Sequence, residues 1–387
     1  MMSVCYYLLL AHLVNSVEQL ARFIARARFK DKPYVVALAG ASASGKSTLA
    51  KRLMNSLDSL HVPLVRMDGR PVAVEADMFY RDETGSISKA LGGNFDHPME
   101  LDVSELESVI FSLIEGNETY VPVYDFKTSR RKGRLGPLLP DENAVIVIEG
   151  LFAIGLLENV SHLNVFVETK SRMELFTRRL VRDVARTGRD LSSIVKDVAT
   201  ALSMWNVYGE GQKQSADIIY RSTYSILEDK GRPSYQVKVS SEVFRERFPV
   251  TWKELSFSTP MNVEDIVIGG VEEQMRGRLF LEDIVPSRFE VSYRALIPSD
   301  LPFTRSLRLS LPSSAYTAFI ILSQIMGYHP RVFHRRIHIV KRGAELIKWY
   351  PDRELVEYDT PNKEDAMKFI DKVGGGVRLH SYYKSLR

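Results

Sequence analysis

The chain has 387 residues, of which 45% are hydrophobic and 26% are charged, so two domains of ordinary size are expected. Its 52 Lys and Arg against 48 Asp and Glu give a net charge of +4, which is too small to indicate a nucleic-acid partner by itself. The single cysteine, Cys5, excludes an internal disulfide framework and a cysteine-based zinc cluster. This composition suits a reducing compartment, and we expect a cytoplasmic protein.

The first ten residues form an apolar run, but no basic segment precedes it and no small-residue cleavage site follows it. Asn15, Glu18 and Gln19 interrupt the run well short of the length that spans a bilayer. Residues 14–29 carry apolar side chains at helical spacing. We therefore predict an N-terminal helical arm over residues 1–30 and no membrane partner.

From residue 34 onward, short apolar runs alternate with helical patterns. Near-continuous runs of Val, Ile and Ala are typical of strands buried on both faces, so this half is expected to hold a parallel sheet covered by helices. The predicted strands cover residues 34–39, 144–150 and 162–169. The predicted helices cover residues 47–57, 102–114 and 171–186, and residues 127–140 are interpreted as a basic loop broken by Gly and Pro. We expect this domain to extend over residues 31–230.

The pattern changes near residues 229–234, where the chain turns to β-rich segments. Strands are predicted at residues 288–296, 306–311, 335–342, 345–350 and 353–359, with helices at residues 314–327 and 362–374. This mixture predicts a second, α+β domain over residues 235–387 with a mainly antiparallel sheet.

One motif stands between the first predicted strand and the helix that follows it. Residues 40–48 read GASASGKST and match the pattern G-x-x-x-x-G-K-[ST] in the required strand–loop–helix context. Backbone N–H groups of such a loop wrap phosphates, while its lysine reaches the β- and γ-phosphates and its hydroxyl binds Mg²⁺. The motif therefore predicts a P-loop NTPase-type α/β domain that binds ATP and Mg²⁺ through Gly40, Ser42, Ala43, Ser44, Gly45, Lys46, Ser47 and Thr48.

Two carboxylates at predicted strand ends are candidates for the chemistry. Asp77 is placed to accept a hydroxyl proton or to position Mg²⁺, although an isolated Asp there is often a helix cap or a turn residue. Glu149 follows a buried strand and, together with Ser47, is a candidate to organise the metal. The basic run at residues 170–189 places Arg178, Arg182, Arg186 and Arg189 at three- and four-residue spacing. This stripe predicts a lid over transferring phosphates, and the alternative is a solvated helix face.

Six ordered segments resemble the uridine kinase and phosphoribulokinase branch of P-loop kinases over about residues 34–228. They are GASASGKST (40–48), EADMFY (75–80), NFDHPMELD (94–102), VPVYDF (121–126), IEGLFA (148–153) and RRLVRDVARTGRD (178–190). The resemblance implies that Asp77 is the catalytic base, assisted by Lys46 and Arg182, and that Arg179 and Arg182 belong to the lid. It also implies acceptor binding by Tyr80, Phe95, Asp96, Tyr124, Phe126 and Arg189. A carboxylate and a guanidinium suit a vicinal diol, and aromatic faces suit a flat heterocycle.

The sequence departs from the family where the pyrimidine base would be recognised. Ser129 stands in place of an expected His, and Asp197 in place of an expected Gln. Because hydrogen-bonding readers discriminate strongly, the loss of both leaves open a different acceptor. The basic residues at 127–134 would suit an anionic acceptor such as a sugar phosphate, and an ordinary exposed basic loop is an equal alternative.

Residues 235–387 resemble, more faintly, the tunnel domain of the CYTH or triphosphate tunnel type. The segments that carry this resemblance are residues 288–294, 327–340 and 354–374. Tunnel enzymes use an alternating E-x-E-x-K strand, and its nearest counterpart here, Glu290 to Arg294, lacks one acid. Arg294, Arg335, Arg336 and Lys341 are candidates for an anion-binding face, and a structural, dimerising or regulatory role is equally open.

Together these features predict an ATP- and Mg²⁺-dependent kinase that phosphorylates a hydroxyl of a nucleoside resembling uridine or cytidine, or of a related ribose or polyol. Two alternatives remain, a tri- or pyrophosphate hydrolase and a nucleotide-binding regulatory protein without turnover. The expected partner is a small-molecule acceptor, with no nucleic acid, and a homo-oligomer is expected.

Overall fold

The computed structural model describes residues 12–82, 96–126, 128–187, 191–270, 272–282, 285–297, 303–311 and 313–374. The chain divides into two compact units. The first comprises Met1–Gly188 and Thr200–Thr223, and the second comprises Arg189–Ala199 and Tyr224–Arg387. Within the described residues, no helix combines the length and the apolar character needed to cross a membrane.

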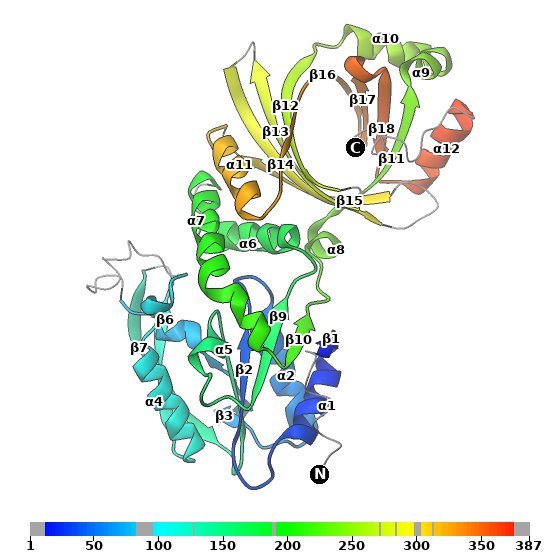
Figure 1. Ribbon diagram of the computed structural model, residues 1–387. Coiled ribbons are helices and arrows are strands. Elements are labelled where there is room, and N and C mark those ends of the chain that lie inside the picture. The colour runs from blue at the N-terminus through cyan, green and yellow to red at the C-terminus, as the bar shows by residue number, and fades with distance from the viewer. Residues whose placement is uncertain are drawn as a thin grey trace. The chain divides into compact units, whose positions relative to one another are not determined.

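The first unit is built on a six-stranded parallel sheet with the order β1–β10–β9–β2–β8–β5. Figure 1 labels β1, β10, β9 and β2 of this sheet. Its strands are β1 (His12–Val14), β2 (Tyr34–Ala39), β5 (Val74–Glu75), β8 (Val145–Gly150), β9 (Leu163–Glu168) and β10 (Ile218–Arg221). Every residue of β2 and of β8 is buried, as their continuous apolar sequences require of central strands. The predicted α/β fold with a parallel sheet and covering helices is confirmed.

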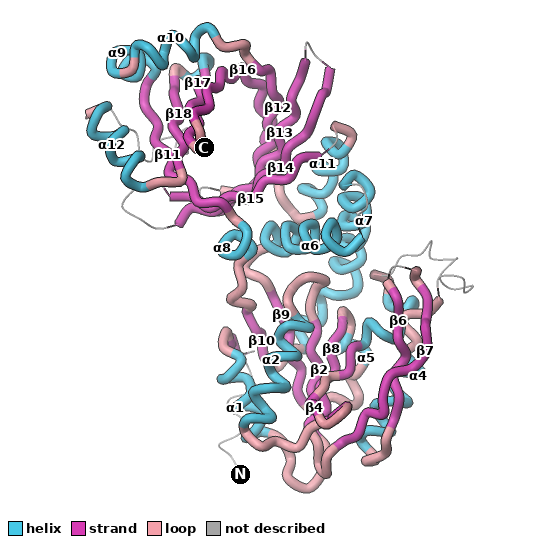
Figure 2. The backbone as a smooth tube through the Cα atoms, turned by 180° about the vertical axis from the view of Figure 1, so that it is seen from behind, coloured by secondary structure: helices cyan, strands magenta, loops and turns pink. Residues whose placement is uncertain are grey.

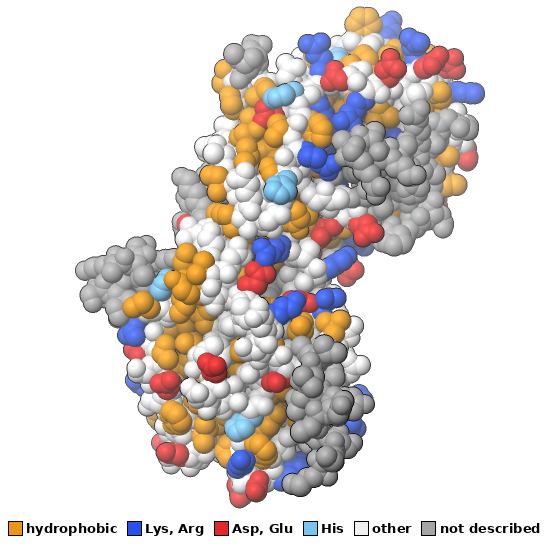
Figure 3. All heavy atoms as spheres, viewed as in Figure 1, with side chains coloured by type: hydrophobic (Ala, Val, Ile, Leu, Met, Phe, Trp, Pro, Cys, Tyr) orange, Lys and Arg blue, Asp and Glu red, His pale blue; other side chains and the backbone are white. Residues whose placement is uncertain are grey.

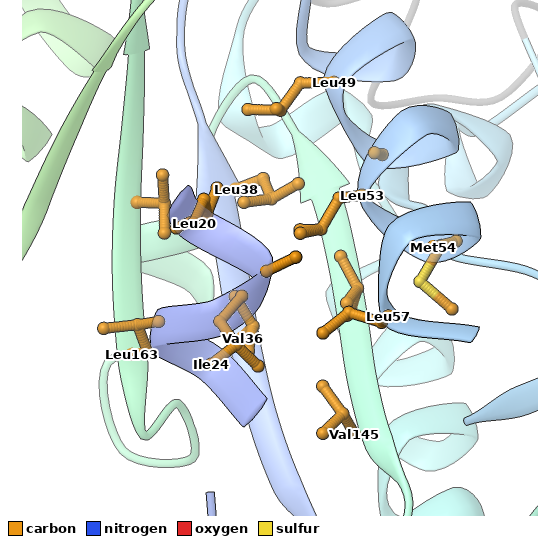
Figure 4. Close-up of a cluster of buried hydrophobic side chains, with 14 of the residues drawn as sticks. Leu20, Ile24, Val36, Leu38, Leu49, Leu53, Met54, Leu57, Val145 and Leu163 are labelled. Carbon is orange, nitrogen blue, oxygen red and sulfur yellow. The ribbon is translucent and has the colours of Figure 1, made fainter. Parts of the chain in front are cut away.

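Two helices form the main core of this unit with one face of the sheet (Figure 4). They are α1 (Val17–Ala27) and α2 (Lys46–Ser59). The close-up shows side chains of both helices against the sheet: Leu20, Ile24, Leu49, Leu53 and Leu57 with Val36, Leu38, Val145 and Leu163. Full burial of such a side chain contributes about 1.5–3 kcal/mol, so this cluster holds the first turn of α2 at the end of β2.

Further helices precede the barrel in the chain. They are α4 (Val103–Ile114), α5 (Ala153–Leu156), α6 (Arg172–Thr187) and α7 (Leu191–Met204), with 3-10 helices at Ala76–Phe79, Pro98–Glu100 and Glu210–Ser215 and a π-helical turn at Trp205–Gly209. The N-terminal helix does not start at residue 14, because His12–Val14 forms an edge strand that pairs with β10. The helix begins after Ser16, whose hydroxyl accepts a hydrogen bond from the backbone N–H of Gln19.

A second, four-stranded sheet in this unit corrects one prediction. Its strands are β3 (Val65–Met67), β4 (Arg70–Pro71), β6 (Thr119–Asp125) and β7 (Arg130–Pro140), in the order β4–β3–β7–β6. The interpretation of residues 127–140 as a loop is wrong, because Arg130–Pro140 pairs antiparallel with β6. Gly133 and Gly136 adopt positive φ angles of 137° and 144°, which allow an irregular ladder despite the Gly and Pro content.

The second unit is a closed antiparallel barrel with the strand order β11–β15–β14–β13–β12–β16–β17–β18. The strands are β11 (Arg232–Ser240), β12 (Met261–Gly269), β13 (Glu273–Glu282), β14 (Val285–Ile297), β15 (Phe303–Leu311), β16 (Arg331–Arg342), β17 (Glu345–Tyr350) and β18 (Leu355–Thr360). The predicted mainly antiparallel α+β fold is confirmed, whereas β11, β12, β13 and the closure were not predicted. The helices lie outside the ring of strands (Figure 2): α8 (Ile226–Lys230), α9 (Ser241–Arg247), α10 (Pro249–Phe257), α11 (Ala315–Ile325) and α12 (Lys363–Val373).

Alternate residues of the barrel strands separate an apolar outer face from a charged interior. In β11, Val237 and Val239 pack in a core with Phe244 of α9 and Phe369 of α12, while Lys238 between them forms an ion pair with Glu357 across the ladder. The main apolar core of this region therefore lies between the barrel wall and the helices outside it. The inward positions are left for polar groups.

The most buried ion pair of the interior joins Asp265 of β12 to Arg278 of β13. The guanidinium donates from Nε and from one terminal nitrogen to the two carboxylate oxygens at 2.6 and 2.8 Å, and the Asp265 side chain is fully buried. Burial alone would raise the pKa of Asp265, but the charge of Arg278 outweighs it and lowers this pKa from its usual 3.8 to about 2.

We predict that Asp265→Asn lowers the free energy of unfolding by about 3 kcal/mol at pH 7, because it leaves the Arg278 guanidinium buried without its counter-charge. A depressed pKa stabilises the fold above the unfolded value of 3.8 and loses this contribution as the pH falls toward 2. The difference in the free energy of unfolding between wild type and variant should therefore become smaller below pH 4. Denaturant unfolding of the whole chain measures it, with the exposed Asp371→Asn as the control, and a gap that stays constant with pH would contradict the assignment.

Candidate active site

The loop of residues 40–48 joins β2 to α2 and has the backbone that its glycines permit. A Cβ atom on Gly40, whose φ is +156°, would lie 2.4 Å from the carbonyl oxygen of Val167. Gly45, at φ +107°, immediately precedes the first residue of α2, and Ala43 also has a positive φ of 69°. The loop thus lies tightly against β9, and its end is the N-terminus of a 14-residue helix.

Lys46 is the first residue of that helix, and its side chain is buried rather than extended into solvent. Only 6% of Lys46 is exposed, and its ammonium donates a hydrogen bond to the Ala41 carbonyl oxygen at 3.2 Å. Ser47 and Thr48, the next two residues, are exposed. The loop therefore combines a fixed buried cation with hydroxyl groups open to solvent.

Glu149, at the C-terminal edge of β8, is the second charged group at this edge. It is 3% exposed and lies opposite Leu38 in the parallel register of β2 and β8. Burial raises its pKa to about 7, against the attraction of the Lys46 ammonium and a hydrogen bond with Ser47, and with Asp77 adding to the rise. Within the described residues, its Oε2 atom has no hydrogen-bond partner. A buried carboxylate oxygen in this condition fits a divalent cation.

Asp77 reaches the same edge through strand pairing. It lies in the 3-10 helix Ala76–Phe79, which follows β5 directly, and β5 runs parallel to β8 with Glu75 opposite Glu149. Gly150 lets these segments approach, since a Cβ atom there would lie 2.6 Å from the Cβ of Ala76. Asp77 is close enough to raise the pKa of both Glu149 and Tyr80. The topology therefore brings the two predicted carboxylates together.

An aromatic cluster lies beside Asp77. The ring centroids of Tyr80 and Tyr124 are 5.5 Å apart, those of Tyr124 and Phe126 are 5.1 Å apart, and those of Tyr80 and Phe126 are 6.2 Å apart. Tyr80 and Tyr124 are buried and Phe126 is 52% exposed. The three rings come from a turn after β5 and from the end of β6. Phe95, predicted to join them, lies outside the described residues.

The basic helix α6 divides into residues with different roles. Arg178 is 6% exposed and bonds to Glu174 at 2.9 Å and to the Ser44 carbonyl oxygen at 3.2 Å. It therefore binds the loop from a buried position and is not part of a solvent-exposed stripe. Arg182 donates to the Ser42 hydroxyl at 2.9 Å. The side chain of Arg186 and the whole of Arg189 lie outside the described residues.

Arg179 and Asp96 form a bidentate ion pair. The two terminal guanidinium nitrogens lie 3.2 and 3.1 Å from the two carboxylate oxygens, and the Arg179 Nε lies 3.4 Å from Asp183. Burial alone would lower the pKa of Arg179, but the charge of Asp96 raises it. A residue predicted for the phosphate side and a residue predicted for the acceptor side thus hold each other.

The hairpin of β6 and β7 contains an anchor that the sequence did not reveal. Arg131 donates to the carbonyl oxygens of Phe79 and Tyr80 at 3.1 and 2.9 Å and to Glu105 at 2.5 Å. Arg134 also binds Glu105, and Lys132 pairs with Asp125. In sequence Arg131 was only one of several basic residues, because its partners are up to 52 residues away. Glu105, an acid in the first turn of the predicted helix, was the sequence feature that could have indicated a basic partner.

Comparison with known proteins finds relatives of the first unit. The sequence profile of the Phosphoribulokinase / Uridine kinase family matches residues 35–225. A uridine kinase of Lactobacillus helveticus is 30% identical over 193 residues, covering 49% of this chain and 86% of that protein. A uridine kinase of Deinococcus deserti is 31% identical over 192 residues, covering 49% and 87%. The solved phosphoribulokinase of Rhodobacter spheroides is 13% identical with a TM-score of 0.35, covering 77% of this chain and 99% of that one.

The parallel sheet, the phosphate-binding loop and the carboxylates at its edge define a P-loop phosphotransferase. The chain belongs to the phosphoribulokinase and uridine kinase family through residues 35–225. The barrel lies beyond the matched residues.

We predict that Gly40→Ala weakens ATP binding by at least about tenfold, because the new Cβ cannot fit 2.4 Å from the Val167 carbonyl oxygen without displacing the loop. Isothermal titration of the whole chain with ATP measures the change. Gly211→Ala is the matched control, since its Cβ would meet no atom within 4 Å. Equal ATP affinity in Gly40→Ala and wild type would show that the close approach does not shape the binding loop.

Proposed function

We propose that residues 31–230 form an ATP- and Mg²⁺-dependent kinase that phosphorylates a hydroxyl of a nucleoside resembling uridine or cytidine. The observation that carries the proposal is the convergence of Asp77, Glu149 and the loop at one sheet edge, with the aromatic cluster beside them. Family membership and the names of the relatives favour the same reaction class.

The nucleotide is assigned to the loop of residues 40–48. Its backbone N–H groups and the N-terminus of α2 would bind the phosphates, and Lys46 would balance their charge. Arg179 and Arg182 of α6 would cover the phosphates, because Arg182 already bonds to Ser42 of the loop. The positive charge of these two arginines would stabilise the negative charge on the phosphoryl group while it is transferred.

Magnesium is assigned to Ser47 and Glu149. The fit is supported by the Glu149 carboxylate, which is buried and has an oxygen without a hydrogen-bond partner among the described residues. Mg²⁺ in kinases is held by one or two protein ligands together with substrate phosphates, and the assignment follows this pattern. When bound, the ion would neutralise charge on the phosphates.

The acceptor is assigned to the region of Asp77 and the aromatic cluster. Asp77 would accept the proton of the attacking hydroxyl, and Tyr80, Tyr124 and Phe126 would flank a flat base. Phe95 and Arg189 are proposed for the same pocket from the family pattern. Asp96 would exchange its Arg179 partner for ribose hydroxyls when the nucleotide draws Arg179 toward phosphate.

The charge around the hairpin favours an uncharged acceptor over a sugar phosphate. Arg131, Lys132 and Arg134 are engaged by the carboxylates of Glu105 and Asp125, so their charge is compensated within the fold. In the lower part of the space-filling view, Lys and Arg side chains likewise lie among Asp and Glu side chains (Figure 3). This leaves the nucleoside as the preferred acceptor class, although Ser129 and Asp197 replace the expected base readers.

We predict that Asp77→Asn lowers nucleoside-stimulated ATP turnover by about 10²–10⁴-fold, because the amide cannot accept the hydroxyl proton. Coupled detection of ADP with Mg²⁺ measures it across uridine, cytidine, sugar phosphates, polyols and no acceptor. Asp68→Asn, an exposed turn residue at φ +49°, is the control and should leave turnover unchanged. ATP loss that is indifferent to the acceptor would favour a hydrolase, and ATP binding without any turnover would favour a regulatory protein.

A second candidate function concerns residues 235–387, which we propose to bind a polyanion such as triphosphate inside a tunnel-like barrel. The supporting observation is the interior charge. Burial lowers the pKa of Arg276, and the neighbouring guanidiniums of Arg278 and Arg294 lower it further, against the opposing charge of Asp265. Several cations therefore act on one another in this part of the interior. Lys348 is held by Glu357 and Asp359, and Arg308 also acts on these groups.

The anion-binding face predicted from Arg294, Arg335, Arg336 and Lys341 does not form as one surface. Arg335 is 9% exposed and pairs with Asp265, whereas its strand neighbour Arg336 is exposed and must point the opposite way. Arg294, whose charge acts on Arg276 and on Glu357, remains on the interior side with Arg335. The polyanion is therefore assigned to the interior, and no hydrolysis is assigned to it.

We predict that the whole chain binds inorganic tripolyphosphate and that Arg276→Gln weakens this binding by about tenfold, because it removes one of the cations that act on one another in the interior. Isothermal titration measures the affinity. Arg342→Gln is the control, since this exposed residue already pairs with Glu254. Failure of wild type to bind, or equal binding by Arg276→Gln, would remove the barrel from consideration as an anion receptor without affecting the kinase assignment.

A further inference from the structure

The first unit contains a cavity of about 760 Å³ between α2, the segment around β4 and β5, and the β6–β7 hairpin. Its apolar lining comes from α2, from the segment around β4 and β5, and from the β6–β7 hairpin. The main contributors are Met54, Met67, Met78, Val121, Leu135 and Leu138. This volume lies within the range of about 300–1,000 Å³ that small-molecule sites occupy in proteins.

The cavity is separate from the acceptor region proposed above. Among the described residues that line it there is no member of the aromatic cluster and neither Asp96 nor Asp77. Among the described residues, those that the cavity shares with the proposed kinase centre are Ser47, Thr48 and Glu149. The cavity thus adjoins the metal end of the centre while leaving the base-binding side untouched.

The chemistry of the lining restricts what the cavity can take. Three methionines give an adaptable, polarisable surface that suits an apolar body of variable shape. The most buried charged group in the lining is Glu149, which is 3% exposed and forms part of the cavity wall. An occupant that offers one hydrogen-bond donor to this carboxylate would make a charge-assisted hydrogen bond and bury its own apolar surface.

We propose that this cavity is a binding site for a largely apolar small molecule that carries one hydroxyl or amine donor directed at Glu149. Because Ser47 and Glu149 are also the residues assigned to magnesium, the occupant and Mg²⁺ exclude each other, and the site regulates turnover through the metal. This last step rests on the proposed kinase function, whereas the binding itself does not.

The test uses 2-phenylethanol and n-propylbenzene, which have nearly the same shape but differ in the hydroxyl donor. Binding to the whole chain is followed in methyl spectra of protein labelled at its 12 methionines. The signals of Met54, Met67 and Met78 should shift, and the alcohol should bind about tenfold tighter than the hydrocarbon because it donates to a carboxylate. This readout locates the probe without any substitution in the cavity.

Two matched variants separate this cavity from general surface binding. Leu135 and Leu139 lie on the same strand and are each 48% exposed, but only Leu135 lines the cavity. Leu135→Trp should weaken binding of both probes at least about tenfold, and Leu139→Trp should not. Glu149→Met should abolish the preference for the alcohol while the hydrocarbon still binds.

Shifts spread over methionines outside the cavity, or equal binding to Leu135→Trp and Leu139→Trp, would overturn the site. Mg²⁺ with ATP should weaken binding of the alcohol and leave that of the hydrocarbon less affected. If the probes bind as expected but Mg²⁺ with ATP has no effect, the exclusion of magnesium is wrong and the binding site stands. Loss of kinase turnover in any acceptor screen would not alter the binding result.

Discussion

The candidate active site depends on the parallel pairing of β8 with β2 on one side and with β5 on the other. Because the carboxyl ends of parallel strands meet at one edge, this pairing brings together the phosphate-binding loop after β2, Glu149 at the end of β8 and Asp77 just after β5. A shift of register by one residue would turn Glu149 to the opposite face of the sheet. The buried core of α1 and α2 prevents such a shift.

The charged side chains at this sheet edge differ in how fully opposite charges within the protein stabilise them. Arg178 with Glu174, Arg179 with Asp96 and Arg131 with Glu105 are paired within the protein. Glu149 differs, because burial raises its pKa to about 7 even beside Lys46. A buried carboxylate that one ammonium does not fully stabilise favours a further cation. The incompletely stabilised carboxylate of Glu149 therefore lies where magnesium is proposed, at the same sheet edge as the loop that is proposed to bind the phosphates.

Much of the first unit could be predicted from the sequence because its signals are local. The buried strands are continuous apolar runs, and the loop needs glycine where φ is positive or backbone approaches backbone. The strand at Arg130–Pro140 was missed because its Gly and Pro content is typical of a loop, although it pairs with the neighbouring β6. Its anchor Arg131 could not be recognised either, because it bonds to residues 26 and 52 positions away. The Arg179–Asp96 pair was also missed, because each residue matched a separate family role and their 83-residue separation hid the contact.

The barrel was harder to predict from the sequence for a different reason. Strands that alternate apolar and polar residues normally place the polar face in water. Here helices α9, α10 and α12 cover the apolar outer face, so the polar face is enclosed instead. The closing pair, β11 with β18, joins segments more than 100 residues apart, for example Lys238 opposite Glu357. The alternation of apolar and polar residues along a strand does not indicate that the sheet closes into a barrel. Once the barrel is closed, the same side chains become an interior in which the guanidiniums of Arg278 and Arg294 lower the pKa of Arg276. This group of cations is the reason that an anion is proposed as the partner of the barrel.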